Sequence, residues 1–220
     1  MSIPLCCAAP TVDLRQVYRY LGCGTTPTPE VEMLCRTLLP EFLSALRCCA
    51  CFLETTVQVQ EDTVCIPGLA PIRSKVLSRN LQGCEKVLLF AATIGSGADR
   101  LRMQAQVRSP ARSVVLDAMG TAAVEALCNQ LCAQWQQRYA PLQLRPRFSP
   151  GYGDLPLALQ KDLLALLDSH RQAGIALSEG LLMLPQKSVS AIVGIGSAGC
   201  ESLLHDCAAC GKLDCAFRLQ

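Results

Sequence analysis

The longest helical pattern in the chain covers residues 109–139. Four apolar side chains at helical spacing form one stripe along it: Leu116, Ala123, Leu127 and Leu131. Segments of strand character lie far from it on both sides, the apolar run KVLLFAATIG at 86–95 and SVSAIVGIG at 188–196. Helices and strands mix without regular alternation, so we expect an α+β fold with a mixed or antiparallel twisted sheet and flanking helices.

The sequence changes character near residue 50. Helical patterns come first, and Thr28 and Pro29 are suited to the N-cap and first turn of the second one. We expect a helical N-terminal segment at 1–50 packed on a main domain at 51–197, followed by a cysteine-rich tail at 198–220. The expected helices are 12–23, 30–49 with a kink or break at Pro40, 74–84 and 157–170. The expected strands are 52–60 with a turn at Glu61-Asp62, 86–95, 174–184 and 188–196, with Pro185 joining the last two.

Composition excludes several classes of protein. Hydrophobic residues make up 50% of the 220 residues and charged residues 17%, which is typical of a globular domain. The net charge of +2 gives no basic face for nucleic acid, and no segment reaches the roughly 20 apolar residues of a membrane span. The N-terminus lacks the pattern of a signal peptide. We therefore expect a cytoplasmic protein, in which most of the 15 cysteines are reduced and pack as small apolar residues.

The loop RPRFSPGYGDLP, residues 145–156, is unusually rich in chemistry for a connection. Arg147 can bind a carboxylate, a ribose oxygen or a phosphate through its planar guanidinium. Gly151 allows close approach of a ligand to the backbone, and Tyr152 offers a ring face and a hydroxyl. The set suits a small zwitterion with an aromatic part. From the residues alone, a rigid crossover loop with a solvated arginine remains the alternative.

Two further features carry charge or metal-binding chemistry. Glu125 lies on a face of the long helical pattern made mostly of small residues, where it could receive an ammonium group; a half-exposed glutamate without function is the alternative. The C-terminal segment 200–218 holds a C-x2-C motif among four cysteines, which suits Zn²⁺ or an iron–sulfur cluster, or else forms reduced packing residues. The proposed metal ligands are Cys200, Cys207, Cys210 and Cys215.

Other motifs are too weak to carry a function. The GSG of 95–97 follows a strand but lacks the third glycine of a dinucleotide fingerprint and the lysine of a P-loop. With only His170 and His205 available, a histidine-based hydrolase has few ways to be built. The four residues CCAC at 48–51 are too compressed for one strand face to present every thiol, which favours packing.

The run RPRFSPGYGDLPLALQKDLLALLD…GIALSEGLLMLPQKSVSAIVGI resembles the reactivation domain of cobalamin-dependent methionine synthase. That family carries an R-x-x-x-G-Y loop that holds S-adenosylmethionine, here Arg147, Gly151 and Tyr152. A helix, an S-E-G strand and an S-V-S strand follow as in the family, and a glutamate on the preceding long helix corresponds to Glu125. The resemblance covers roughly residues 84–196, and the N-terminal part is similar to short stand-alone members. It implies these ligand-binding residues: Glu125, Arg147, Ser149, Gly151, Tyr152 and Glu179.

The resemblance also implies a mechanism and a set of partners. The domain presents S-adenosylmethionine to a cobalamin held by a partner, so that an electron and a methyl group restore methylcobalamin from inactive cob(II)alamin. The partner is a cobalamin-binding methionine synthase module or another corrinoid protein, with flavodoxin or a reductase as electron donor. Such a chain is a subunit rather than an enzyme by itself. The alternative is a metal or iron–sulfur electron-transfer module, or a structural partner of a corrinoid protein, without S-adenosylmethionine binding.

Overall fold

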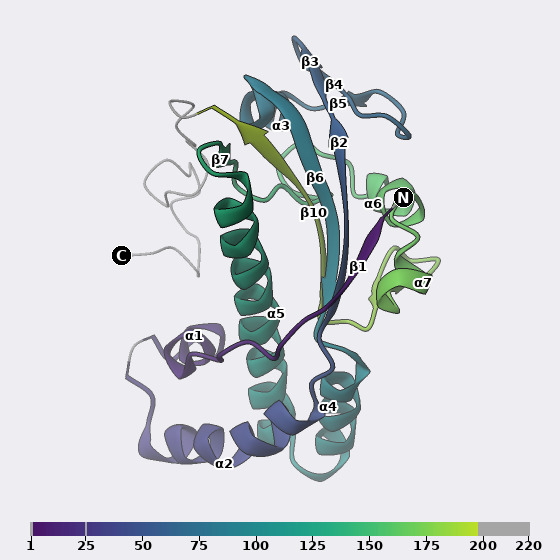
Figure 1. Ribbon diagram of the computed structural model, residues 1–220. Coiled ribbons are helices and arrows are strands. Elements are labelled where there is room, and N and C mark those ends of the chain that lie inside the picture. Colours follow the sequence, from purple (N-terminus) through teal and green to yellow (C-terminus); the bar gives the residue numbers. More distant parts are fainter. Residues whose placement is uncertain (1, 25, 198–220) are drawn as a thin grey trace.

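The computed structural model describes residues 2–24 and 26–197, which form an antiparallel sheet between two layers of helices (Figure 1). Every neighbouring pair of strands in this sheet is antiparallel. This topology confirms the expected α+β class. In the order in which they lie side by side, the five strands are β1 (Ile3–Cys6), β2 (Cys49–Thr56), β6 (Cys84–Thr93), β10 (Ser188–Gly196) and β7 (Gln143–Leu144).

Helices cover both faces of the sheet (Figure 1). One face packs against α5 (Pro110–Tyr139), which α1 (Leu14–Tyr20), α2 (Pro29–Ala45) and α4 (Ser96–Arg108) contact in turn. The other face packs against α3 (Lys75–Leu81), α6 (Leu159–Leu166) and α7 (Ser169–Ala173). Two small antiparallel sheets complete the described fold: β3 (Gln58–Gln60), β4 (Thr63–Cys65) and β5 (Ile72–Arg73), and the pair β8 (Ala176–Leu177) and β9 (Met183–Leu184).

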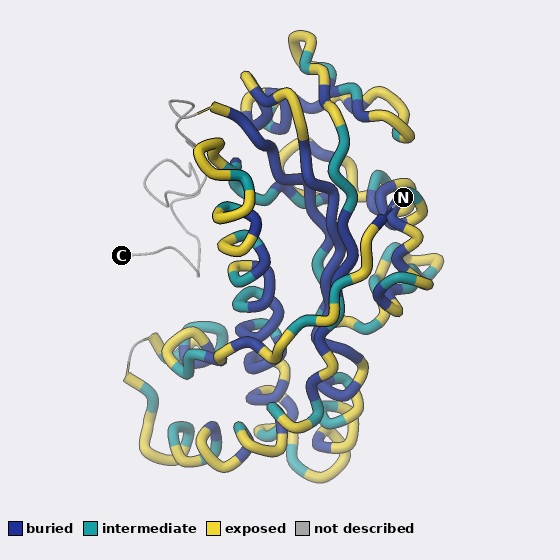
Figure 2. The backbone as a smooth tube through the Cα atoms, in the orientation of Figure 1, coloured by how far each residue is buried: buried dark blue, intermediate teal, exposed yellow. Residues whose placement is uncertain are grey.

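The period-2 alternation of the central strand β6 divides the core in two. Leu88, Phe90 and Ala92 pack toward α5, and the alternate residues Val87, Leu89 and Ala91 pack toward α3, α6 and α7. Figure 2 shows the result as a buried central sheet and a buried stripe along α5. All six of these side chains are fully buried. A central strand apolar on both faces therefore needs helices on both sides.

Several local predictions are confirmed. The hydroxyl of Thr28 accepts a hydrogen bond from the backbone N–H of Val31 at 3.5 Å, and Pro29 is the first residue of α2. The break considered at Pro40 is wrong, because α2 runs through this proline without interruption. Glu61 adopts a positive φ of 51° in the turn between β3 and β4, as expected for the turn at 61–62.

Four features differ from the sequence expectation. The strand expected at 174–184 is a hairpin, because a turn containing Leu181 at φ 60° separates β8 from β9. The helix expected at 157–170 is interrupted between α6 and α7, where Asp168 has a φ of 46°. The first fifty residues also contain β1, which the sequence did not indicate and which pairs with β2 at the sheet edge. Helix α2 ends at Ala45, short of 49, because Cys49 begins β2.

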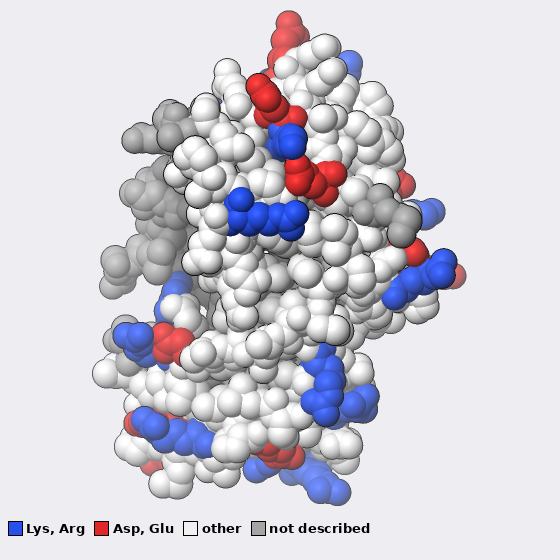
Figure 3. Space-filling model, viewed as in Figure 1, with Lys and Arg blue, Asp and Glu red and all other residues white. Residues whose placement is uncertain are grey.

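The surface carries charges of both signs. In Figure 3, basic and acidic side chains lie side by side over the upper part of the face, and much of its middle is uncharged. Among the described residues, no helix combines the length and the apolar character needed to cross a membrane.

Candidate functional site

The loop 145–156 continues the short strand β7 along the edge of β10. The backbone of Phe148 exchanges two hydrogen bonds with Ile192, each 2.9 Å, and the N–H of Arg145 donates to the carbonyl of Gly194 at 2.8 Å. A side chain on Gly194 would clash with Arg145, since its Cβ would lie 2.8 Å from Cγ of that arginine. The loop is therefore part of the sheet edge, fixed in place by backbone hydrogen bonds.

The two aromatic residues of the loop differ in burial. Phe148 is 2% exposed and belongs to the core that α3 and α6 cover. Tyr152 is 57% exposed and packs against Phe148 in a T-shaped arrangement, with ring centroids 5.5 Å apart and planes at 85°. The buried ring thus supports the exposed residue, which remains open to solvent or ligand.

Gly151 occupies a backbone conformation that favours glycine. Its φ is +88°, and its N–H donates to the carbonyl of Leu155 at 2.9 Å. The carbonyl of Ser149 accepts a hydrogen bond from the N–H of Tyr152 at 3.1 Å, so both residues belong to the same tight turn. Glycine is needed here for the turn itself, whatever the loop binds.

Asp154 anchors the loop to α3. Its carboxylate accepts hydrogen bonds from the backbone N–H of Lys75 at 2.7 Å and of Val76 at 3.4 Å, and from the hydroxyl of Ser74. The Ser74 hydroxyl is the main reason that the pKa of Asp154 lies below its usual value. The acid of the loop therefore satisfies a helix N-terminus.

Arg147 and Glu125 lie together between the loop and α5. Nη2 of Arg147 and Oε2 of Glu125 are 2.9 Å apart, in a pair whose side chains are 18% and 44% exposed. Nη1 of Arg147 is buried and has no hydrogen-bond partner among the described residues. An orphaned, buried guanidinium nitrogen is costly, so it marks a position where a ligand acceptor would be stabilising. The structure thus joins two residues that the sequence suggested separately.

Two thiols and a phenol surround this ion pair. Burial raises the pKa of Cys128 to about 12, although the positive charge of Arg147 acts in the opposite direction. Burial also raises the pKa of Cys132, one turn further along α5. The pKa of Tyr20 on α1 is raised by burial and then by the negative charge of Glu125. Tyr20 was not predicted as a site residue, because nothing in its local sequence relates α1 to the loop.

The two turns of α5 that precede Glu125 contact Lys187, the residue just before β10. Nζ of Lys187 lies 3.0 Å from the carboxylate of Asp117 and donates to the hydroxyl of Thr121 at 2.9 Å. A Cβ on Gly120 would lie 2.9 Å from Cγ of Lys187, so this glycine leaves room for the lysine to cross the helix. Gly120 and Thr121 therefore have a structural use in holding Lys187 against the helix.

The remaining predicted site residues lie elsewhere. Glu179 is exposed in the turn between β8 and β9, and within the described ranges it makes no hydrogen bond or ion pair with Arg147 or Glu125. The four proposed metal ligands lie outside the described residues. Over residues 2–24 and 26–197, no group of three or more metal-binding side chains could hold an ion. The proposed metal ligands that lie outside the described residues are Cys200, Cys207, Cys210 and Cys215.

Comparison with known proteins shows the fold. The chain is similar to the solved structure described as the MetH reactivation domain bound to AdoHcy, with a TM-score of 0.71 and 14% sequence identity. The match covers 88% of this chain and 78% of that one. No protein-family model and no curated protein matches the chain. The similarity is therefore one of fold, and the assignment of the site depends on the residues described above.

Proposed function

We propose that the chain binds S-adenosylmethionine and acts as the activation subunit of a cobalamin-dependent methionine synthase or a related corrinoid methyltransferase. The observation that carries the proposal is the Arg147–Glu125 pair under an R-x-x-x-G-Y loop, with one buried guanidinium nitrogen unpartnered. The similarity in fold to a reactivation domain solved with AdoHcy supports it.

The ligand chemistry matches the charges of the pair. S-adenosylmethionine carries an α-carboxylate and an α-ammonium on one carbon, and ribose hydroxyls further along. Nη1 of Arg147 would donate to the carboxylate or a ribose oxygen, and the half-exposed Glu125 would accept from the ammonium. Gly151 and Ser149 would offer backbone groups, and Tyr152 an exposed ring face. Glu179 stays a predicted contact, carried by the β8–β9 hairpin.

The protein would contribute position rather than a nucleophile. Cys128, the thiol nearest in sequence to Glu125, has a pKa of about 12 because it is buried, so it stays protonated at neutral pH. A protonated thiol is a poor nucleophile and would not remove the methyl group from a bound sulfonium. The cobalamin of the partner, reduced by one electron from a flavodoxin or reductase, would supply the acceptor chemistry.

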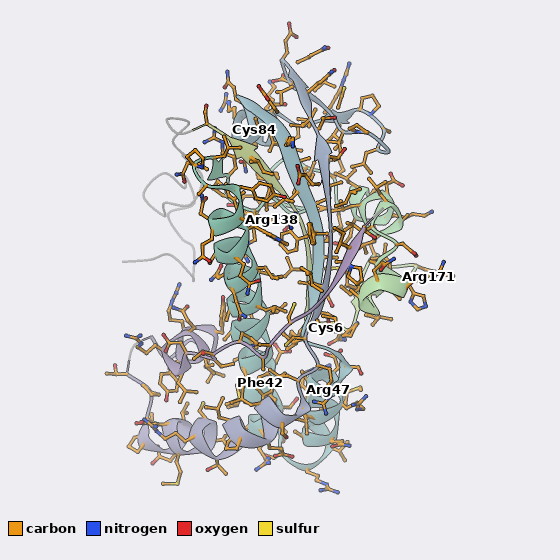
Figure 4. The ribbon with its side chains drawn as sticks, in the orientation of Figure 1. Cys6, Phe42, Arg47, Cys84, Arg138 and Arg171 are labelled. Atoms are coloured by element: carbon orange, nitrogen blue, oxygen red, sulfur yellow. The ribbon has the colours of Figure 1, made fainter. Side chains whose placement is uncertain are left out.

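Calorimetry with matched variants tests the ligand. Arg147→Ala is expected to weaken S-adenosylmethionine binding about 10- to 150-fold, the equivalent of about 1.5–3 kcal/mol for a charge-assisted hydrogen bond. The control is Arg171→Ala, because Arg171 is an 83% exposed arginine on α7 (Figure 4) and should leave binding unchanged. Absence of binding to the wild type at millimolar ligand would overturn the proposal, as would equal affinity in Arg147→Ala.

A reactivation assay tests the partner. The chain, S-adenosylmethionine and a reductant are mixed with a corrinoid protein in its cob(II)alamin form, and methylcobalamin is followed by its visible spectrum. The proposal predicts methylation that requires the chain and is weakened by Arg147→Ala. Ligand binding without any methylation would leave a binding protein but reject the activation role. Tight association with the corrinoid protein without ligand binding would favour a structural role.

A further inference from the structure

Two pairs of adjacent cysteines face each other where β1 meets β2. In the antiparallel register Cys6 lies opposite Cys49. The next residues along, Cys7 and Cys48, are joined by a backbone hydrogen bond from the N–H of Cys7 to the carbonyl of Cys48 at 3.1 Å. Hydrogen-bonded and non-hydrogen-bonded pairs alternate in an antiparallel ladder, so Cys6 and Cys49 form a non-hydrogen-bonded pair. Pro4, two residues before Cys6, fits this alternation because it has no N–H to donate.

The two pairs lie on opposite faces of the sheet. Cys7 and Cys48 belong to the core that α5 covers, and burial raises the pKa of each thiol to about 11. Cys49 packs at the border of the opposite core, and Cys6 is exposed at the free edge of β1 (Figure 4). Of the four thiols, Cys6 is therefore the most accessible to a solvent-borne reagent, and Cys49 is the cysteine opposite it in the register.

The geometry of a non-hydrogen-bonded pair suits a covalent link. Its Cα atoms are typically about 4.5 Å apart, inside the range of about 4.4–6.8 Å found for disulfides. Directly opposed Cβ atoms lie about 4.5–5.5 Å apart and must approach slightly to bond. Because β1 is the edge strand of the sheet formed by residues 2–24 and 26–197, with no strand of that part of the chain on its outer side, it can make this small movement.

We propose that Cys6 and Cys49 form a redox-active dithiol that closes to a cross-strand disulfide by exchange with a low-molecular-weight disulfide. The Cys6 thiolate attacks one sulfur of the reagent, giving a mixed disulfide and releasing one thiol. The Cys49 thiolate then displaces the second thiol, so one reagent disulfide is reduced to two thiols while the protein dithiol loses two electrons and two protons. In a reducing cytosol such a bond would be transient, as redox-sensing disulfides are.

The disulfide would join the two ends of the segment from Cys6 to Cys49, so that this segment forms a covalent loop. This part contains α1 and α2, two of the helices that pack against α5. Tyr20 of α1 lies within it, close enough for the charges of Glu125 and Arg147 to act on its pKa. The disulfide would thus tie the element that borders the candidate site to the edge of the sheet. The inference itself does not depend on what that site binds.

Mass spectrometry of the full chain tests the bond. The reduced protein is equilibrated with mixtures of oxidised and reduced glutathione, free thiols are blocked with N-ethylmaleimide, and the tryptic peptides are compared with and without reduction. Cys6 and Cys7 share one tryptic peptide ending at Arg15, and Cys48, Cys49, Cys51 and Cys65 share another at 48–73. The linked peptides alone do not identify the two bonded cysteines, so single cysteine variants are needed to identify them.

The two pairs serve as controls for each other. The linked peptides are expected in the wild type, in Cys7→Ser and in Cys48→Ser, and to be absent from Cys6→Ser and Cys49→Ser. Closing the loop should raise the melting temperature of the oxidised wild type by roughly 5–15 °C, with no change in Cys6→Ser. Failure of the folded wild type to form the link in oxidised glutathione overturns the proposal. So does a link that persists in Cys6→Ser, or one from Cys6 to any cysteine but Cys49.

Discussion

Replacing Asp154 tests whether α3 holds the ligand loop in place. Its carboxylate accepts from the backbone N–H of Lys75 and Val76, at 2.7 and 3.4 Å, and from the Ser74 hydroxyl. A charge-assisted hydrogen bond contributes about 1.5–3 kcal/mol, but Asp154 is exposed, so solvent screening reduces its contribution. We expect Asp154→Ala to lower the free energy of unfolding by about 1–2 kcal/mol, in line with the loss of a helix cap. Asp154→Asn keeps one acceptor oxygen and should lose about half as much.

The loss should depend on pH. The Ser74 hydroxyl, helped by the N–H groups of Lys75 and Val76, holds the pKa of Asp154 below its usual value. A carboxyl with a lower pKa in the folded state contributes stability above its unfolded pKa, about 3.9, and loses it as the pH falls through the folded value. The difference in stability between wild type and Asp154→Asn should therefore be complete at pH 7 and shrink below about pH 4.

Urea denaturation followed by circular dichroism measures this prediction, at pH 7 and in steps down to pH 3.5. Asp162→Asn is the matched control, because Asp162 is an exposed aspartate of α6 outside the loop. The loosened loop should also bind S-adenosylmethionine more weakly in Asp154→Ala than in the control. Equal urea midpoints at pH 7 for wild type and Asp154→Ala would refute the anchoring argument.

Two glycine substitutions give further expected outcomes. A Cβ on Gly97 would lie 2.0 Å from the backbone oxygen of Ala45, so Gly97→Ala should cost more than about 3 kcal/mol in urea denaturation. Gly174→Ala is its control: φ is +68° with nothing within 4 Å, so about 1 kcal/mol is expected, and equal losses would contradict the steric argument. Gly151→Ala should remain folded, with about 1–2 kcal/mol lost because φ is +88° and Leu157 lies 3.2 Å from the added methyl. Its affinity for S-adenosylmethionine by calorimetry should also fall, and unchanged affinity would make the loop a connector.

The sequence predicted the helices that depend on interactions within a single segment. The N-cap of α2 at Thr28 and the long helix α5 follow from capping chemistry and apolar spacing, which act within one element. The strand β1 could not be found in this way. It is four residues long, contains Pro4 and is mostly exposed, so its identity depends on pairing with β2, more than forty residues further along. The hairpin at 176–184 was missed for a related reason, since its turn uses Leu181 at a positive φ without a glycine at that position.

The site shows the same limit at the level of single side chains. Motif similarity selected Arg147 and Glu125 as two independent ligand contacts, yet the crossing of the loop over α5 pairs them at 2.9 Å. This pairing uses Nη2 of Arg147 and leaves Nη1 without a partner among the described residues, while Glu125 stays 44% exposed. On the proposed function, a ligand carboxylate would meet Nη1 and a ligand ammonium would meet the Glu125 carboxylate, without breaking the ion pair. The adjacent opposite charges, which the sequence could not reveal, would then favour a zwitterionic head group over a ligand with a single charge.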